Sequence, residues 1–524
     1  MADRHVFTID LGTSGPKVAL FTLDGGFVAG EFSPVELVFT DDGGVEQRPD
    51  DWWGGIVEGS RRLWAGVDVD PASVAAVSVT SQWSGTVAVD EQGHALADAI
   101  IWMDARGAEQ TRRLVGGLVK VAGYEPRKLK RWIQLTGGAP AHSGKDPISH
   151  ILFIEDRLPE VARRTAVYLE PKDYLNLRLT GRAVSTFDSI VLHWLTDNRD
   201  PSRIDYVPEL VAASGIDRAK LPDLVAATDV VGGLLADVAA ELGLPAGVPV
   251  VGGTPDVQSA AIGSGAVRDF EAHLYVGTSS WLTCHVPFKK TDLLRGVASL
   301  PSPLPGRYFI ANEQETAGAC LNWLRDRVLY PDDALGGPPA PDDVFARLDA
   351  LAATSPEGAN GVIFTPWLNG ERTPVDDHTI RAGWHHLSLS NNRADQVRAV
   401  LEGVAFNGRW LMGVVERFVG RPFPWLHFIG GGANSALWCQ IHADVLDREI
   451  RQVSHPIRAN ARGAALLASL ALGEITVEEI GAKVEIAATY RPRPQHRATY
   501  DRLYDAFTEI YKANKKIHSE LAGH

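Results

Sequence analysis

The stretch that decides the fold is VPVVGGTPDVQSAAIGSGAVRDFEAHLYVGTSS, residues 248–280. Its apolar start, 248–251, predicts a buried strand, which a Gly-Gly pair then breaks. Asp256 follows, just ahead of a small-residue segment, 257–265, that predicts a closely packed helix. Because ligands of α/β proteins bind where strands end and helices begin, we expect Asp256 to face a ligand.

A repeated tripeptide points to a duplicated architecture. A second strand, 273–276, ends in Gly-Thr-Ser at 277–279, and the apolar strand predicted at 6–10 ends in Gly-Thr-Ser at 12–14. Glycine lets a backbone approach closely, and the amide and hydroxyl donors of such a turn suit phosphate oxygens. One copy alone would be ordinary turn chemistry. Two copies at matching strand ends predict two related domains that grip one polyphosphate between them.

The composition excludes several classes of protein. The 524 residues suffice for two large domains, and 45% hydrophobic with 22% charged residues is typical of a globular protein. A net charge of −14 argues against nucleic acid as a partner, although a local cation can still hold an anionic nucleotide. The first residues enter a strand without an apolar leader, and the segment 464–472 is too short to span a bilayer. We therefore expect a cytoplasmic protein that binds neither nucleic acid nor membrane.

The three cysteines indicate a reducing compartment. They lie at 284, 320 and 439, without the CxxC spacing of a zinc site and without a disulfide framework. We expect them to be buried thiols.

The N-terminal segment predicts an antiparallel meander of three short strands, at 6–10, 17–21 and 27–31. Asp10 ends the first strand and would hold water on Mg²⁺, because carboxylates bind this ion largely through its hydration shell. Lys17 either contacts a phosphate or is a solvated strand residue, and the pattern favours neither reading.

Two polar loops that contain tryptophan have the chemistry of a sugar site. The first, 80–85, follows a strand predicted at 74–79, and the second follows an apolar segment at 100–103. The candidate side chains are Gln82, Trp83, Ser84, Trp102, Asp104 and Arg106. Hydrogen-bonding groups beside flat aromatic faces suit a sugar, whereas either tryptophan taken alone is more typical of a core residue.

The rest of the chain supplies helices, loops and one further ligand motif. We predict helices at 52–64, 148–156, 395–415, 436–446, 461–472 and 500–520, and irregular surface segments at 137–146 and 201–222. A glycine loop, 430–435, joins a strand at 425–429 to the helix at 436–446. Such a loop lets a flat ligand lie against the backbone.

Six segments taken together resemble the FGGY carbohydrate kinases, with the xylulokinases as the most similar branch. They are TIDLGTSGPKVALFTLDG, GGTPDVQSAAIGSGAV, the second GTS turn, NGERTP, RAVLEGVAF and GGGANSALWCQIHADVLDREI. The resemblance spans 6–472 and implies an α/β fold of two actin/hexokinase/Hsp70-like (ribonuclease H-like) domains with an interdomain cleft. Residues 1–265 would hold the sugar and the catalytic base, and residues 266–524 would bind the nucleotide.

The resemblance also implies roles for individual residues. Asp256 corresponds to the catalytic base and also contacts the sugar, while Asp10 and Asp256 lie near Mg²⁺. The implied phosphate and nucleotide contacts are Gly12, Thr13, Gly277, Thr278, Gly318, Asn322, Gly431, Gly432 and Asn434. The chemistry of the two turns adds Ser14, Lys17 and Ser279 as candidates. The implied sugar contacts are Gln82, Trp83, Ser84, Trp102 and Asp104.

The departures from the xylulokinase pattern fall at the sugar site. Xylulokinases usually show Met-His where this chain has Trp83-Ser84, and Asn where it has Val257. Their Asp-Tyr-Ser-Asp-Ala-Ser pattern reads TFDSIV here, at 186–191. We therefore expect an ATP- and Mg²⁺-dependent kinase for a ketopentose such as xylulose or ribulose, with a polyol or tetrose (xylitol, erythritol, glycerol-like) as alternative.

Two other classes of function stay open. A nucleotide-binding switch or chaperone of the same superfamily would need no positioned base, and a sugar-binding regulator would lack the phosphate turns. The expected partners are a small sugar and ATP, and a homodimer is a further open possibility. A helix start beside Asp256 would lower the pKa of this carboxyl and desolvation would raise it, and the sequence does not decide between them.

Overall fold

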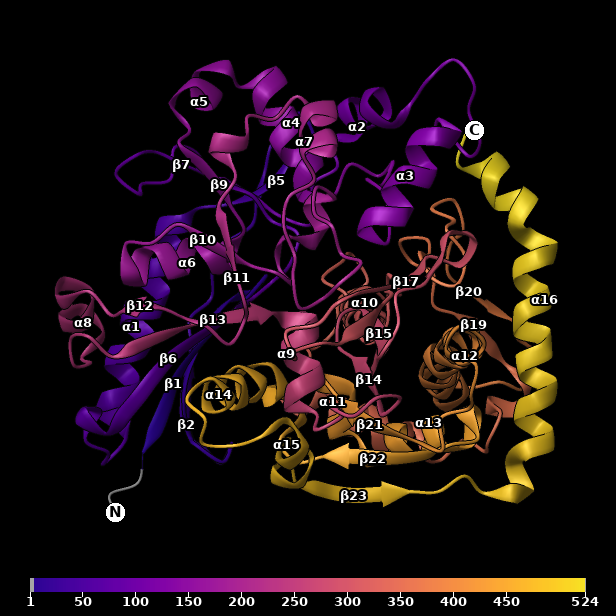
Figure 1. Ribbon diagram of the computed structural model, residues 1–524. Coiled ribbons are helices and arrows are strands. Elements are labelled where there is room, and N and C mark those ends of the chain that lie inside the picture. Colours follow the sequence, from indigo (N-terminus) through magenta and orange to yellow (C-terminus); the bar gives the residue numbers. More distant parts are fainter. Residues whose placement is uncertain (1–3, 524) are drawn as a thin grey trace.

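The computed structural model describes residues 4–523 and contains two large sheets built on one plan (Figure 1). The extreme ends of the two predicted domains, residues 1–3 and 524, lie outside this range. The first sheet has the strand order β12-β13-β6-β1-β2-β3. Its strands are β1 (His5–Gly12), β2 (Gly15–Thr22), β3 (Phe27–Phe32), β6 (Val74–Ser81), β12 (Val230–Gly233) and β13 (Pro249–Pro255). The antiparallel pairing of β1 with β2 and of β2 with β3 confirms the predicted meander.

The second sheet repeats this arrangement with the order β16-β17-β18-β15-β14-β21-β22-β23. Its strands are β14 (Ala272–Val276), β15 (Ser280–Val286), β16 (Thr291–Asp292), β17 (Val297–Pro301), β18 (Tyr308–Ala311), β21 (Trp425–Ile429), β22 (Glu449–Val453) and β23 (Ile486–Tyr490). In each sheet a hairpin, β1–β2 or β14–β15, turns on a Gly-Thr-Ser sequence, and its first strand pairs in parallel with β6 or β21. The predicted duplication is therefore present in both strand order and strand direction.

Helices of the first half surround its sheet and form a cap above it (Figure 1). They are α1 (Pro49–Gly66), α2 (Ala108–Val115), α3 (Pro126–Thr136), α4 (Pro147–Arg157), α5 (Pro159–Arg164), α6 (Pro171–Thr180), α7 (Pro208–Ser214), α8 (Ala236–Leu242) and α9 (Asp256–Gly263). Six of these helices begin with proline, whose fixed φ and missing N–H suit the first position of a helix. Small two- and three-stranded sheets complete this half.

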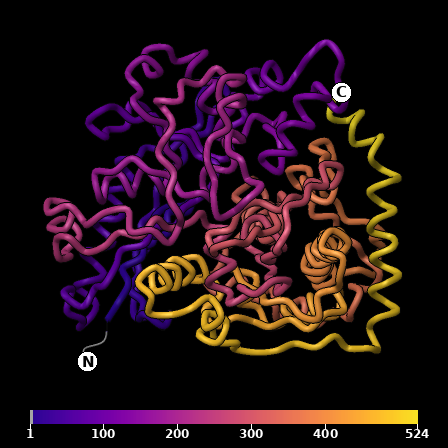
Figure 2. The backbone as a smooth tube through the Cα atoms, in the orientation of Figure 1, coloured from indigo at the N-terminus to yellow at the C-terminus, as the bar shows by residue number. Residues whose placement is uncertain are grey.

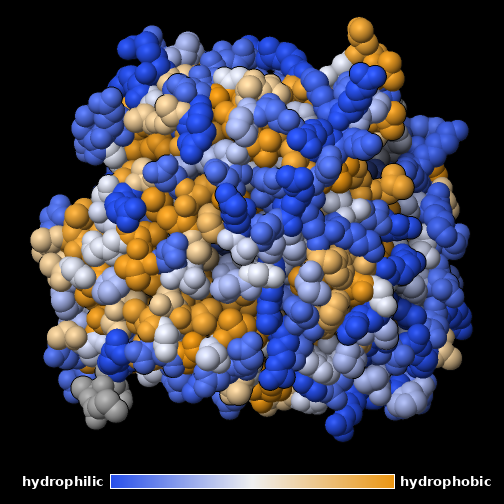
Figure 3. Space-filling view, in the orientation of Figure 1, coloured by the Kyte–Doolittle hydropathy of each residue, from blue (hydrophilic) through white to orange (hydrophobic). Residues whose placement is uncertain are grey.

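Helices of the second half confirm most of the predicted segments. They are α10 (Ala319–Leu324), α11 (Val344–Ala352), α12 (Arg393–Val419), α13 (Ala436–Leu446), α14 (Ala459–Ala471), α15 (Val477–Lys483) and α16 (Arg497–Leu521). Along its length, α16 borders the second half and ends at the corner opposite the N-terminus (Figure 2). The edge of the molecule along which it runs is mostly hydrophilic, as expected for an amphipathic helix, although Ile517 and Leu521 near its end are exposed (Figure 3).

Two helices of similar position, α9 and α14, join the halves by packing on the opposite sheets. From the second half, α14 contacts β1, β6 and β13, where Ala465 lies in one cluster with Val6 and Val251. From the first half, α9 places Ile262 in one cluster with Ile429 of the second sheet. Each half therefore completes part of its core with a helix from the other half.

Glycines allow α9 and α14 to approach each other closely. A Cβ atom on Gly263 would lie 1.8 Å from the backbone oxygen of Ala459, and one on Gly463 would lie 1.8 Å from that of Ser259. Because both contacts are to backbone atoms, no side-chain movement could accommodate a larger residue at either position. The joint between the halves is thus a backbone-to-backbone crossing.

Three local predictions are wrong. The Gly-Gly pair does not break its strand: β13 continues to Pro255 through a bulge, in which Gly253 has φ +73° and lies against Val79 of β6. The segment 201–222 contains α7 and is not irregular throughout. The segment 137–146 is a loop, but all of it is buried or half-buried because it packs between the halves.

The cysteine prediction is confirmed, since Cys284, Cys320 and Cys439 are free and buried. Among residues 4–523, no helix combines the length and the apolar character that crossing a membrane requires.

Candidate active site

Asp10, Lys17 and Asp256 form the charged centre of the site. Asp10 on β1 and Lys17 on β2 are direct cross-strand partners, and Lys17 Nζ donates to Asp10 Oδ2 at 3.2 Å. Asp256 is the first residue of α9, and its Oδ1 accepts the N–H of Val257 at 2.8 Å. The bulge in β13 precedes Asp256 directly and changes the direction of the chain before it enters the helix.

Desolvation dominates the electrostatics of Asp256. It raises the pKa of this carboxyl to about 7, and the negative charges of Asp10 and Glu313 act in the same direction. The N–H of Val257 and the charge of Lys17 lower the pKa but do not prevail. Burial therefore raises the pKa of Asp256 more than the N–H of Val257 at the helix start lowers it. A carboxylate with a pKa near neutrality suits a general base.

Burial raises the pKa of Tyr275 on β14, and the carboxylates of Asp256 and Asp10 raise it further. This strand leads into the second Gly-Thr-Ser turn, just as β1 leads into the first. The acidic centre therefore lies within electrostatic range of strands from both halves. The charges of Asp10 and Glu313 both act on Asp256, while Lys17 pairs with Asp10 and Arg372 pairs with Glu313. Carboxylates such as Asp10 and Asp256 suit a hydrated divalent cation. Among residues 4–523 no three His, Cys, Asp or Glu side chains lie together in a group that could hold a metal ion.

The first Gly-Thr-Ser turn is tied to the predicted sugar loops. Thr13 Oγ1 donates to Gln82 Oε1 at 3.1 Å and accepts from Trp102 Nε1 at 3.0 Å. Gln47, which the sequence reasoning missed, donates to the Thr13 carbonyl at 2.7 Å and accepts from Gln82 Nε2 at 2.7 Å. The Thr13 hydroxyl is thus engaged by protein groups, and the turn has its backbone amides to offer a phosphate. No local pattern marks Gln47, which ends the short strand β5 (Val45–Gln47).

The second turn contacts Gly318, one of the predicted nucleotide residues. The N–H of Gly318 donates to the carbonyl of Gly277 at 2.7 Å, and a Cβ on Gly318 would lie 2.4 Å from that oxygen. Thr278 is exposed at the tip of the turn, and Asn322 is exposed one helical turn after Gly318. The close approach at Gly318 explains why glycine is required there.

The glycine loop after β21 lies beside the same turn. A Cβ on Gly432 would lie 2.8 Å from Val276, the residue before the turn. Gly431 and Asn434 are exposed, and a Cβ on Gly431 would meet no atom within 4 Å. The structure therefore gathers the predicted nucleotide residues of the second half around one strand end.

Trp83 and Ser84 are held by protein partners. Trp83 Nε1 donates to the carbonyl of Ser189 at 2.9 Å, and its ring lies 6.0 Å from that of Phe309 on β18. The N–H of Ser84 donates to Glu170 Oε2 at 3.0 Å, and its hydroxyl donates to the Lys145 carbonyl at 2.8 Å. Both residues therefore shape the loop and its contact with the second half.

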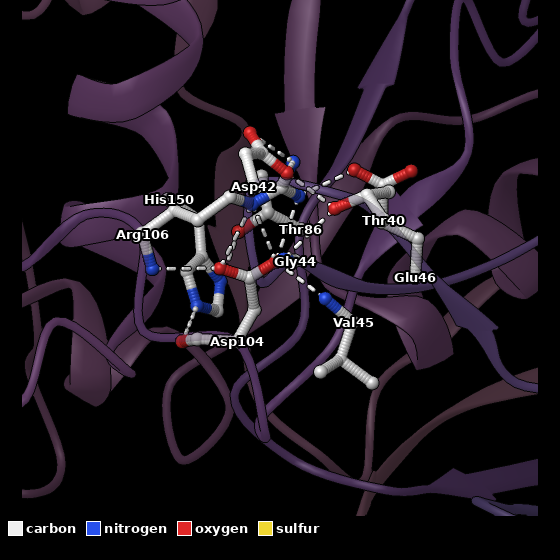
Figure 4. A network of polar contacts seen from close by, with 9 residues as sticks. All are labelled: Thr40, Asp42, Gly44, Val45, Glu46, Thr86, Asp104, Arg106 and His150. Atoms are coloured by element: carbon white, nitrogen blue, oxygen red, sulfur yellow. Dashed lines mark hydrogen bonds and ion pairs between the residues drawn. The ribbon is translucent and has the colours of Figure 1, made fainter.

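Asp104 is a structural residue in this site, contrary to the predicted sugar contact. Its side chain is 1% exposed, and its two oxygens accept the N–H groups of Val45 (2.9 Å) and Arg106 (2.8 Å) and the Arg106 guanidinium (2.7 Å) (Figure 4). Arg106 also pairs with Glu46, and His150 lies against the Asp104 carbonyl with a pKa lowered by burial to about 4. These hydrogen bonds fix the loop and occupy both oxygens of the Asp104 carboxylate, so neither oxygen is available to a sugar hydroxyl.

Residues 5–263 match the N-terminal domain of the FGGY family of carbohydrate kinases, and residues 272–472 match its C-terminal domain. The chain belongs to the FGGY family of carbohydrate kinases. It is accordingly an ATP-dependent sugar kinase with a two-domain α/β fold, and the family resemblance expected from the sequence is confirmed.

The relatives of this FGGY kinase are named for more than one substrate. A xylulose kinase of Staphylococcus epidermidis is 28% identical over 533 residues, with 99% of each chain covered. A solved xylulose kinase from Brucella ovis superposes with a TM-score of 0.84 at 25% identity, covering 98% of this chain and all of that one. A gluconate kinase from Lactobacillus acidophilus superposes equally well, with a TM-score of 0.85 at 22% identity, covering 99% and 100%. The fold alone therefore does not choose the sugar.

Proposed function

We propose that this FGGY kinase transfers the γ-phosphoryl group of ATP to a hydroxyl of a small sugar, with Asp256 as the general base. A ketopentose such as xylulose or ribulose is the first candidate, because xylulose kinases are similar over nearly the whole chain. A polyol or tetrose is the alternative acceptor. The observation that carries the proposal is the near-neutral pKa of Asp256 beside Asp10 and within range of strands from both halves.

In this mechanism Asp256 accepts the proton of the sugar hydroxyl on Oδ2, because its other oxygen, Oδ1, already accepts a hydrogen bond from the N–H of Val257. The amides of the two turns, with Lys17, stabilise charge on the phosphate oxygens, because phosphoryl transfer depends mainly on positioning and charge neutralisation. Asp10 and Asp256 would hold Mg²⁺ through water, and this ion would supply further neutralisation when bound.

The remaining site residues divide between the two substrates. Gly12, Ser14, Lys17, Thr278 and Ser279 would line the phosphates, and Gly318, Asn322, Gly431, Gly432 and Asn434 would lie along the nucleotide. Gln82 and Trp102 would line the sugar site, beside the first Gly-Thr-Ser turn. The cytoplasm is the compartment we propose, because three buried free thiols suit a reducing environment.

A coupled ADP-release assay with ketopentoses, tetroses, polyols and gluconate tests the proposal. The parent enzyme should be stimulated by at least one acceptor, and Asp256→Asn should lose about 10²–10⁴-fold of that turnover while ATP binding is retained. Asp237→Asn is the matched control, because Asp237 also lies in the first turn of a helix of the same half but is exposed. ATP hydrolysis that no acceptor stimulates would favour a nucleotide-binding switch. Near-parental turnover of Asp256→Asn would remove Asp256 from the mechanism.

A further inference from the structure

A charged cluster that the mechanism does not use lies where the two halves meet. Lys145 comes from the first half, and Glu313, Glu315, Glu371 and Arg372 come from the second. Glu371 and Arg372 belong to the NGERTP segment, which the sequence reasoning quoted without giving it a role. The guanidinium of Arg372 forms ion pairs with Glu313 and with Glu315, each at 2.5 Å.

The cluster is preformed by a buried carboxylate. Glu371 is fully buried, and its Oε1 accepts the backbone N–H groups of both Glu315 and Arg372 at 2.9 Å. Its Oε2 accepts Asn407 Nδ2 from α12 at 2.5 Å. One side chain therefore fixes the two backbone segments that carry Glu315 and Arg372, so the ion pairs are oriented before any ligand arrives.

Arg372 faces the sugar side of the first half. Its Cζ lies 5.8 Å from the ring centroid of Trp102, whose Nε1 is bonded to Thr13. Lys145 Nζ lies 3.9 Å from Glu315 Oε1, and the Lys145 carbonyl accepts the Ser84 hydroxyl. The cluster thus spans the two halves beside the predicted sugar loops.

Two members of the cluster keep polar groups free for a ligand. The side chains of Arg372 and Glu313 are 26% and 30% exposed, and Arg372 has five N–H groups, of which these ion pairs use only some. Glu313 also lies close enough to Asp256 for its charge to act on that carboxylate. By contrast, Trp83, Ser84 and Asp104 are engaged by protein groups.

We propose that Arg372 and Glu313 form the second-half wall of the sugar site and select a neutral polyhydroxylated acceptor over a sugar acid. Arg372 donates N–H groups to sugar oxygens, and Glu313 accepts from a hydroxyl. This assignment rests on the proposed kinase function and deepens it.

Charge is the reason for the exclusion of acids. Both cations of the wall, Lys145 and Arg372, are already paired with the carboxylates of Glu313 and Glu315. An acceptor with its own carboxylate would add a further negative charge beside groups whose cations are already paired. A neutral sugar exchanges only hydrogen bonds with the same wall.

Steady-state kinetics of the whole enzyme test this inference. The parent should phosphorylate neutral ketoses or polyols, with gluconate at least about tenfold poorer in kcat/KM. Arg372→Met should raise the sugar KM about 10–100-fold, as expected for losing hydrogen bonds to a charged group, while the ATP KM changes less than about twofold. Arg372→Lys should retain part of the sugar affinity. In Glu313→Gln, the ratio of kcat/KM for a neutral acceptor to kcat/KM for gluconate should decrease.

Arg448→Met is the matched control. Arg448 forms a half-buried pair with Glu416 inside the second half, at 2.9 Å and 22% and 16% exposure, so it reports general destabilisation without touching the junction. It should leave both KM values unchanged, and melting curves should accompany every variant. A parental sugar KM in a folded Arg372→Met enzyme would overturn the role of Arg372, and gluconate as the best acceptor would overturn the neutral-acceptor assignment. A parent that no acceptor stimulates would refute the kinase proposal itself, which is a distinguishable result.

Discussion

A single methyl group at the crossing of α9 and α14 should disturb both stability and catalysis. In Gly463→Ala the new Cβ would lie 1.8 Å from the backbone oxygen of Ser259, whereas ordinary contact begins at 3.4 Å. The helices must therefore separate by about 1.5 Å, because the obstructing atom belongs to a backbone. Overpacking of this kind costs about 1–3 kcal/mol, and the better helix propensity of alanine offsets about 1 kcal/mol of it. We expect a net loss of up to about 2 kcal/mol in the free energy of unfolding.

The same displacement should reach the chemistry, because Asp256 is the first residue of α9. A shift of about 1 Å in a catalytic geometry can reduce the rate about 10²-fold. Chemical denaturation and acceptor-dependent ADP release measure the two effects on one preparation. We expect kcat to fall about 10–100-fold in Gly463→Ala, with the protein still folded at 25 °C.

Gly54→Ala gives the opposite expectation and serves as the control. Gly54 lies inside α1, and a Cβ there would meet no atom within 4 Å. Alanine at this position should stabilise the protein by about 0.5–1 kcal/mol without changing kcat. If Gly463→Ala were as stable and active as Gly54→Ala, the close crossing would be refuted. Lost stability with an unchanged kcat would keep the packing argument but refute its link to Asp256.

Four further outcomes follow from the site. With Asp256 as a base of pKa about 7, the kcat/KM for the sugar should fall about tenfold per pH unit on the acid side and level off above pH 7; a profile that stays flat across about pH 5–8 would contradict this role. Asp104→Asn should lower the free energy of unfolding by about 1–3 kcal/mol, because it weakens the charged hydrogen bonds to the half-buried Arg106, which keeps Glu46 as a partner, as denaturant titration would detect. Trp83→Ala should cost up to about 3 kcal/mol by the same assay, because it removes a half-buried ring that lies beside Phe309. Sugar together with a non-hydrolysable nucleotide should reduce the radius of gyration in small-angle scattering, and an unchanged radius would argue against closure of the two halves.

The sequence by itself determined the local elements and the duplication. Apolar runs are properties of neighbouring residues, so the segments 74–79 and 425–429 correctly predicted β6 and β21. The two Gly-Thr-Ser tripeptides correctly indicated that the hairpins β1–β2 and β14–β15 occupy matching positions in two sheets. The position of Asp256 at a strand-to-helix transition was also readable, because both elements are encoded next to it.

Only the tertiary structure decided which partner each polar side chain takes. Asp104 has the residue type and the loop setting of a sugar contact, yet its oxygens are satisfied by Val45 and Arg106. Arg372 lay in a quoted motif, but its approach to Trp102 depends on how the two halves pack. Likewise, a Gly-Gly pair that reads as a strand break is held within β13 because β6 runs beside it. Hydrogen-bond partners and close approaches come from segments that are distant along the chain. The type and spacing of neighbouring residues do not specify which distant segment will pack against them.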